Sequence, residues 1–73
     1  MKGNLVIEGK VLEDDGYGGK HYNKIFDEWW ESDDIDSLID TIVRNGYLKF
    51  YRLGVPCYLM LSNMSCIYFN EIK

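Results

Sequence analysis

The clearest pattern of apolar and polar positions lies in the middle of the chain, between residues 34 and 45. Its apolar residues recur every three or four positions: Ile35, Leu38, Ile39, Ile42 and Val43. This spacing places them on one face of an α-helix. Ser32 or Asp33 can cap the start, and Gly46 follows the end, where glycine commonly terminates a helix. The pattern predicts a helix over about 34–45.

The two ends of the chain are richer in β-branched and aromatic residues, as strands are. Residues 4–13 alternate in part between apolar and polar, and Gly9 is a candidate position for a bulge. After residue 46, three short runs are separated by turn sequences, which predicts an antiparallel meander. These runs cover residues 47–52, 57–61 and 66–72.

Both cysteines fall on the last two of these predicted strands. A tight turn over residues 62–65 would place Cys66 opposite Leu61 and Cys57 opposite Asn70. The sulfur atoms would then lie roughly 13 Å apart, at about 3.4 Å per strand residue, which is beyond disulfide reach. We therefore expect two free thiols, packed as small hydrophobic side chains, which fits a reducing compartment.

Residues 22–31 fit two kinds of secondary structure. Five apolar residues have helical spacing: Tyr22, Ile25, Phe26, Trp29 and Trp30. A strand here would instead pair with residues 4–13 as a hairpin, and the aromatic content favours that arrangement. We expect one α+β domain over residues 1–73, with an antiparallel sheet of three to four strands packed against the main helix. A second short helix at 23–31 is the alternative to a strand.

Composition suggests that a single copy does not hide all of its apolar surface. A chain of 73 residues forms one domain, and a domain of this size buries only about 60% of the surface that its unfolded chain exposes. The apolar fraction is 47% and the aromatic fraction 15%, which is rich for so small a chain. We therefore expect a homodimer or higher homo-oligomer.

The net charge of −4 argues against direct binding to nucleic acid, whose affinity comes mainly from Lys and Arg. The stretch from Leu53 to Asn70 carries no charge, but polar residues interrupt it, and its apolar pieces are shorter than the roughly 20 residues that a bilayer requires. No apolar segment of a secretory signal follows Met1-Lys2. We expect a cytoplasmic protein without membrane contact.

The acidic residues are concentrated in one segment. Residues 25–43 contain seven of the twelve acidic residues and both tryptophans, with no Lys or Arg. Asp33, Asp34 and Asp36 fall in the first turn of the predicted helix, where the helix dipole favours negative charge. The others form a candidate recognition surface for a protein with a basic surface: Asp27, Glu28, Trp29, Trp30, Glu31 and Asp40. An ordinary solvated face beside buried tryptophans is the alternative.

The glycine-rich loop over residues 14–20 resembles a phosphate-binding loop only superficially. Asp14 stands where the Walker A pattern needs its first glycine, and His21 replaces the hydroxyl residue that would bind magnesium. A flexible connection is the simpler interpretation. Tyr17, Lys20 and His21 are nevertheless candidate contacts for a small ligand.

Metal binding and catalysis find little support in the residue types. One histidine and two cysteines with eight residues between them do not form a zinc spacing, and the acidic segment lacks the glycine and closing glutamate of an EF-hand loop. No nucleophile stands near His21 in the sequence. We expect no cofactor, no metal and no enzymatic activity.

These observations lead to two hypotheses. The first is a small acidic interaction module that regulates or inhibits a protein partner through its acidic and aromatic surface, in its sharpest form by mimicking nucleic acid. The second is an oligomer that binds a nucleotide-like small ligand at its subunit junctions, through Tyr17, Lys20 and His21.

Overall fold

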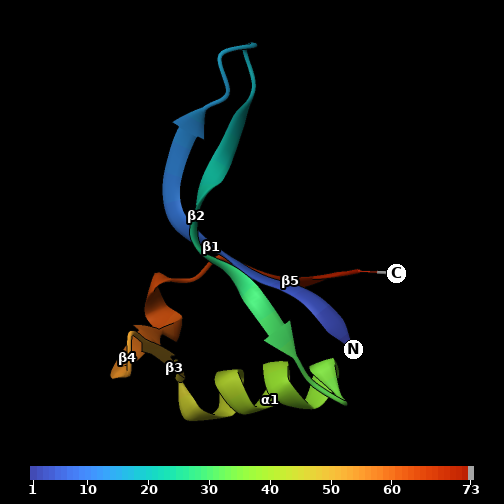
Figure 1. Cartoon of the computed structure of the whole chain (residues 1–73). Helices are drawn as coiled ribbons and strands as arrows, with labels where there is room; N and C mark the ends of the chain where they lie inside the picture. The colour runs from blue at the N-terminus through green and yellow to red at the C-terminus, as the bar shows by residue number, and fades with distance from the viewer. Residues whose placement is uncertain (73) are drawn as a thin grey trace.

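The computed structural model describes residues 1–72 and has an α+β fold (Figure 1). In chain order the elements are β1 (Lys2–Asp14), β2 (Lys20–Glu31), α1 (Ile35–Asn45), β3 (Tyr47–Arg52), β4 (Val55–Met60), the short 3-10 helix η1 (Leu61–Asn63) and β5 (Cys66–Glu71). They form a three-stranded sheet of order β2-β1-β5 and a two-stranded sheet of β3 and β4. All strand pairs are antiparallel.

The helix α1 ends at the predicted residue but begins one residue later than predicted, and neither of the predicted caps, Ser32 or Asp33, is its N-cap. Asp34 is the N-cap, and its carboxylate accepts a hydrogen bond from the Ser37 backbone N–H. Gly46 follows with φ of 82°, and its N–H donates to the Ile42 carbonyl. Glycine is needed there because an L side chain at positive φ is strained. Within residues 1–72, no helix is long and apolar enough to cross a membrane.

Residues 20–31 form the strand β2, so the alternative of a short helix at 23–31 is wrong. Ile7 pairs with Phe26, whereas the next residue of β1, Glu8, pairs with Lys24. This register shift leaves Ile25 without a partner, and both Ile25 and Phe26 reach the hydrophobic core. Because of this bulge, two adjacent residues of the strand face the core. The same two apolar residues also fit a helical spacing, which is why the sequence alone allowed both interpretations.

The antiparallel meander predicted for the last three strands is wrong in its final pairing. β5 pairs with β1, between Gly3 and Glu8, and not with β4. Ser65 fixes this connection, because its N–H donates to the Glu8 carbonyl and its hydroxyl to the Gly9 carbonyl, at 2.8 and 2.7 Å. The bend at residues 61–65 is thus anchored on β1 instead of forming a tight hairpin turn.

The changed pairing also changes the neighbours of the two cysteines. Cys66 lies opposite Glu8 and Cys57 opposite Phe50, so the predicted positions opposite Leu61 and Asn70 are wrong. Both thiols are free, as expected. Cys57 is half-buried, but Cys66 is exposed, so the expectation that both thiols are packed as small hydrophobic side chains is wrong for Cys66.

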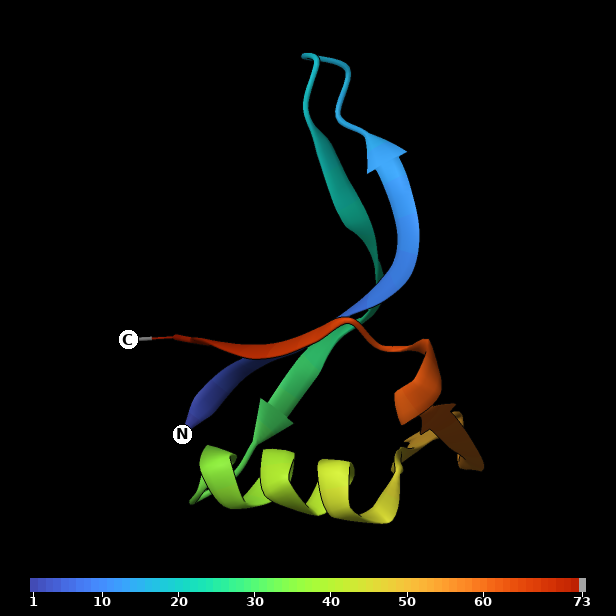
Figure 2. The ribbon, with the colours of Figure 1, turned by 180° about the vertical axis from the view of Figure 1, so that it is seen from behind.

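The core lies between one face of the three-stranded sheet and the elements packed on it, α1 and the β3–β4 hairpin (Figures 1 and 2). We call this the inner face. Its buried members come from most elements of the chain: Leu5, Ile7, Phe26, Ile42, Leu48 and Met64. The opposite, outer face has Val6 at its centre, which is fully buried between its cross-strand neighbours Asp27 and Tyr68.

The β1–β2 hairpin continues well beyond the body of the molecule (Figure 1). β5 accompanies β1 only as far as Glu8, so the distal part of the hairpin has two strands and no third. We call this part, residues 9–25, the arm. It accounts for the elongated shape, whose principal extents are 38 × 30 × 26 Å.

Candidate functional site

The two tryptophans point to opposite faces of the sheet, as neighbours on a strand do. Trp30 lies on the inner face, where it packs against the core and meets the Phe26 ring edge-on at 6.2 Å between ring centroids. Trp29 lies on the outer face and is 51% exposed. Its indole N–H donates to the Glu31 carboxylate at 3.3 Å. Trp29 is therefore the tryptophan available to a partner.

The acidic neighbours of Trp29 on β2 differ in how they are engaged. Asp27 shares the outer face, where its carboxylate accepts from the Asn4 amide at 2.9 Å and lies 3.8 Å from the Lys24 ammonium. Part of its charge is thus balanced within the chain. Glu31 has no cation paired with it among residues 1–72 and is exposed.

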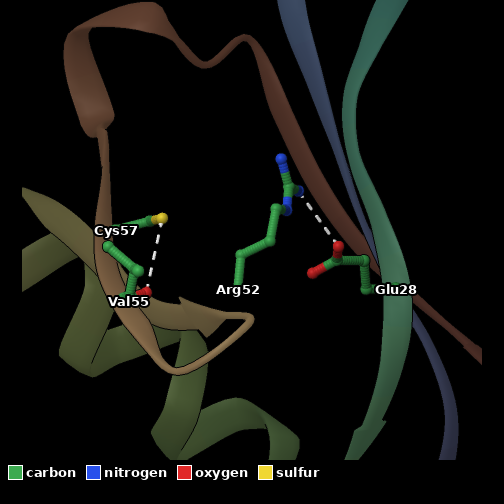
Figure 3. Close-up of polar contacts among 4 residues, drawn as sticks. All are labelled: Glu28, Arg52, Val55 and Cys57. Carbon is green, nitrogen blue, oxygen red and sulfur yellow. Dashed lines mark hydrogen bonds and ion pairs between the residues drawn. The ribbon is translucent and has the colours of Figure 1, made fainter.

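Glu28 serves a different purpose, because it faces the β3–β4 hairpin. Its carboxylate lies 3.0 Å from the Arg52 guanidinium, which joins β2 to the end of β3 (Figure 3). The guanidinium also lies 5.4 Å from the centroid of the Phe50 ring. Both charged side chains are substantially exposed, so this ion pair contributes about 0.2 to 1 kcal/mol. Glu28 is therefore already bound to a cation of its own chain.

A groove runs between the start of α1 and the end of β5. Its volume is about 360 Å³, and Ile35, Ile39 and Phe69 supply apolar side chains to it. Its remaining lining residues include four carboxylates: Asp33, Asp34, Asp36 and Glu71. A second recess of about 330 Å³ shares Met1 and Asp33 with the groove and adds Glu31. Carboxylates therefore continue from Glu31, beside Trp29, into the groove.

We call this surface the acidic end and define it by five residues: Glu31, Asp33, Asp34, Asp36 and Glu71. The cations lining its recesses are the Met1 amino group, which donates to the Ser32 carbonyl at 2.7 Å, and Lys2. Asp40 lies one turn along α1 from Asp36 and is exposed. It extends the negative charge along the helix without lining the groove.

Asp34 of the acidic end is held by hydrogen bonds from the first turn of α1. The Ser37 N–H and hydroxyl each lie 3.1 Å from an oxygen of its carboxylate. These hydrogen bonds to the charged form lower the pKa of Asp34. Asp34 is therefore held by the helix it caps, and the other four carboxylates are the ones free to meet a partner.

The three candidate ligand contacts Tyr17, Lys20 and His21 lie at the far end of the arm and are all exposed. The loop beside them is closed by its own hydrogen bonds. The Asp15 carboxylate accepts from the N–H groups of Tyr17 and Gly19, at 2.7 and 3.1 Å, and these bonds lower its pKa. In one copy of the chain these contacts face solvent, far from the groove.

Of the six residues proposed for the recognition surface, the structure brings together Trp29 and Glu31 at the acidic end, with Asp27 on the same face. It directs Glu28 and Trp30 to the inner face and places Asp40 farther along α1. The sequence alone did not predict the groove. Its helix carboxylates are explained locally by capping, and Glu71 reaches them only through the β1–β5 pairing, which no local pattern indicates.

Residues 1–72 contain no group of three or more His, Cys, Asp or Glu side chains placed to hold a metal ion. The geometry instead presents a carboxylate-lined groove with apolar side chains, and Glu31 links the recess next to this groove to the exposed Trp29 indole. Comparison with known proteins adds no relative: no protein-family model, no curated protein and no solved structure matches this chain.

Proposed function

We propose that this protein is a non-catalytic interaction module that docks on a basic surface of a protein partner through Trp29 and the acidic end. The observation that carries the proposal is the link, through Glu31 and the second recess, between the half-exposed Trp29 indole and the carboxylates that line the groove. Trp is enriched among the residues that dominate binding energy at interfaces. Apolar side chains in the groove offer additional contact area for the aliphatic part of a Lys or Arg side chain.

The charge distribution suits a basic partner in particular. Four carboxylates of the acidic end are not committed to capping α1, namely Glu31, Asp33, Asp36 and Glu71. A concentration of one sign of charge accelerates association with the opposite sign, and this acceleration falls as salt rises. The indole and the groove supply contacts that salt weakens less.

A sharper form of the proposal is that the partner is a nucleic-acid-binding protein and that the carboxylates occupy its phosphate-binding surface. Carboxylates of this kind can take the place of phosphates opposite Lys and Arg side chains. The protein would then inhibit or regulate its partner by excluding nucleic acid. Nucleic acid and this protein would compete for one surface, so each would displace the other.

Affinity capture from native cells tests the proposal with four baits, one of which is a charge-matched control. The baits are the unmodified chain, Trp29→Ala, the double variant Glu31→Gln/Asp36→Asn and the control Glu8→Gln/Glu13→Gln. The two double variants remove the same charge, but Glu8 and Glu13 lie away from the acidic end. The docked partner is retained by the control and lost from the first two variants.

The captured complex should also weaken at least tenfold between 50 and 200 mM salt, because several ion pairs are formed at once. DNA or RNA added to the complex distinguishes the mimic from ordinary docking, since only the mimic is displaced. A partner that binds all four baits equally would show that the acidic end has no role in recognition.

A further inference from the structure

A single copy of the chain exposes more surface than a compact protein of its mass. Its accessible surface is 5278 Å². A compact monomer of 8.6 kDa is expected to expose about 4,700 Å², so the excess is about 600 Å². The radius of gyration is 13.2 Å, compared with about 11 Å for a compact domain of this length. Both quantities indicate surface that has not been folded into the body.

The arm contributes to this excess, because it extends beyond the body of the molecule. Beyond Glu8 it consists of two strands with no third strand along either edge. An isolated two-stranded hairpin is marginally stable in water because it lacks a covered hydrophobic face. Unpaired strand edges that carry apolar side chains are also the usual site of association between chains. The arm therefore has the character of an element that another surface covers.

The apolar side chains of the arm are distributed over both of its faces. Leu12 lies opposite Tyr22, so the two side chains share one face. Val11, the neighbour of Leu12, points to the other face, beside a recess of about 310 Å³ that Ile25 and Leu59 also line. Val11, Leu12 and Tyr22 are between 42% and 61% exposed. The arm packs on the body at its base, through Ile25, but Val11, Leu12 and Tyr22 remain largely uncovered in one copy.

Charge distinguishes the arm from the rest of the molecule. Its three lysines balance its three acidic residues: Lys10, Lys20 and Lys24 against Glu13, Asp14 and Asp15. The arm is thus neutral, and the whole net charge of −4 falls on the remaining residues. An arm with no net charge does not select a basic partner, and it meets no net repulsion when it approaches a second copy.

We propose that two copies of this chain associate through their arms, so that each copy covers Val11, Leu12 and Tyr22 of the other. The excess surface of about 600 Å² approaches the roughly 800 Å² that each partner buries in a standard stable interface. The recess beside Val11 provides additional apolar area. The interface lies away from the acidic end, so this proposal is independent of docking on a basic partner.

Sedimentation equilibrium of the full chain from about 1 to 200 µM tests the proposal. We expect reversible association to a species of about 17 kDa, twice the mass of one copy. The variant Leu12→Thr/Tyr22→Thr keeps strand propensity and removes apolar contact, and should raise the dissociation constant at least tenfold. The control Tyr51→Thr/Val55→Thr makes similar changes at exposed positions of the β3–β4 hairpin and should leave association unchanged.

Hydrogen exchange of the unmodified chain provides a second measurement that needs no variant to fold. Amides of the arm should become protected as the protein concentration rises, whereas amides of the core strands keep their protection. A monomer at 200 µM would overturn the proposal. So would association that the arm variant leaves unchanged, association that the β3–β4 control abolishes, or arm amides that exchange equally fast at both ends of the concentration range.

Discussion

Replacing Ile42 by alanine tests how α1 is held against the sheet. Ile42 is 2% exposed and belongs to the core cluster that joins the helix to Leu5 and Ile7 of β1. Its neighbour Val43 is 55% exposed and points away from that cluster. The two residues therefore share a helix and a β-branched side chain but differ in burial, which makes Val43→Ala a matched control.

The expected cost of Ile42→Ala follows from the carbons it removes. Three buried carbon groups at about 0.8 kcal/mol each give roughly 2.4 kcal/mol of transfer free energy, and the cavity left behind raises this toward 3 to 4 kcal/mol. The higher helix propensity of alanine returns about 0.4 kcal/mol. The net loss is about 3 kcal/mol, from a total stability of roughly 4 to 11 kcal/mol for a chain of this length.

Urea denaturation followed by tryptophan fluorescence and circular dichroism measures this loss. With a slope near 1 kcal/mol/M, the midpoint should fall by roughly 2 to 3 M for Ile42→Ala. Val43→Ala should change the free energy of unfolding by no more than about 0.5 kcal/mol. Equal effects of the two substitutions would refute the reasoning, because they would mean that α1 does not dock on the sheet through the face that carries Ile42.

Three further predictions address the caps, the indoles and a turn. Because the pKa of Asp34 is lowered in the folded state, its stabilising effect is complete above the pKa of an unfolded aspartate, about 3.9, and is lost as the pH falls through the folded pKa. Asp34→Asn should therefore reduce the dependence of the urea midpoint on pH in this acidic range. In single-tryptophan variants made by Trp→Phe substitution, acrylamide should quench Trp29 strongly and Trp30 weakly, and equal quenching would contradict their opposite orientations. Leu53 has a φ of 52°, a left-handed conformation that asparagine tolerates better than leucine, and its side chain is 99% exposed. Leu53→Asn should therefore raise the free energy of unfolding, measured by urea denaturation, by about 1 kcal/mol. A lower free energy of unfolding would contradict this reasoning, because it would mean that the leucine side chain makes stabilising contacts.

Local signals allowed α1 to be predicted to within one residue at its start. Its apolar spacing and its terminal glycine act over a few residues, so they can be read from the chain directly, whereas the cap is Asp34 and not Ser32 or Asp33 as predicted. The conformation of residues 22–31 could not be decided in the same way. Ile25 and Phe26 fit a helical period, and in the strand they reach the core together only because of a register shift that depends on the partner strand β1.

The pairing of β5 was beyond sequence analysis for a related reason. A short link after β4 favours a hairpin, but Ser65 binds the carbonyls of Glu8 and Gly9 instead, and these residues are distant in the chain. The candidate site could be predicted only in part, because it depends on the same pairing of β5 with β1. The acidic character of the region could be expected, but the sequence did not show which tryptophan is exposed, and Glu71 enters the groove only through that distant pairing.

The position of β5 beside β1 also determines when the fold can be completed during protein synthesis. Among the described strands β1 is made first and β5 last, so one edge of β1 waits for a neighbour until all the elements between them have been translated. At about 5 to 20 residues per second, this interval lasts several seconds. The nascent chain presents Leu5 and Ile7 without their final cover throughout that time. Deleting β5 should therefore leave a product that chaperones and proteases recognise as unfinished.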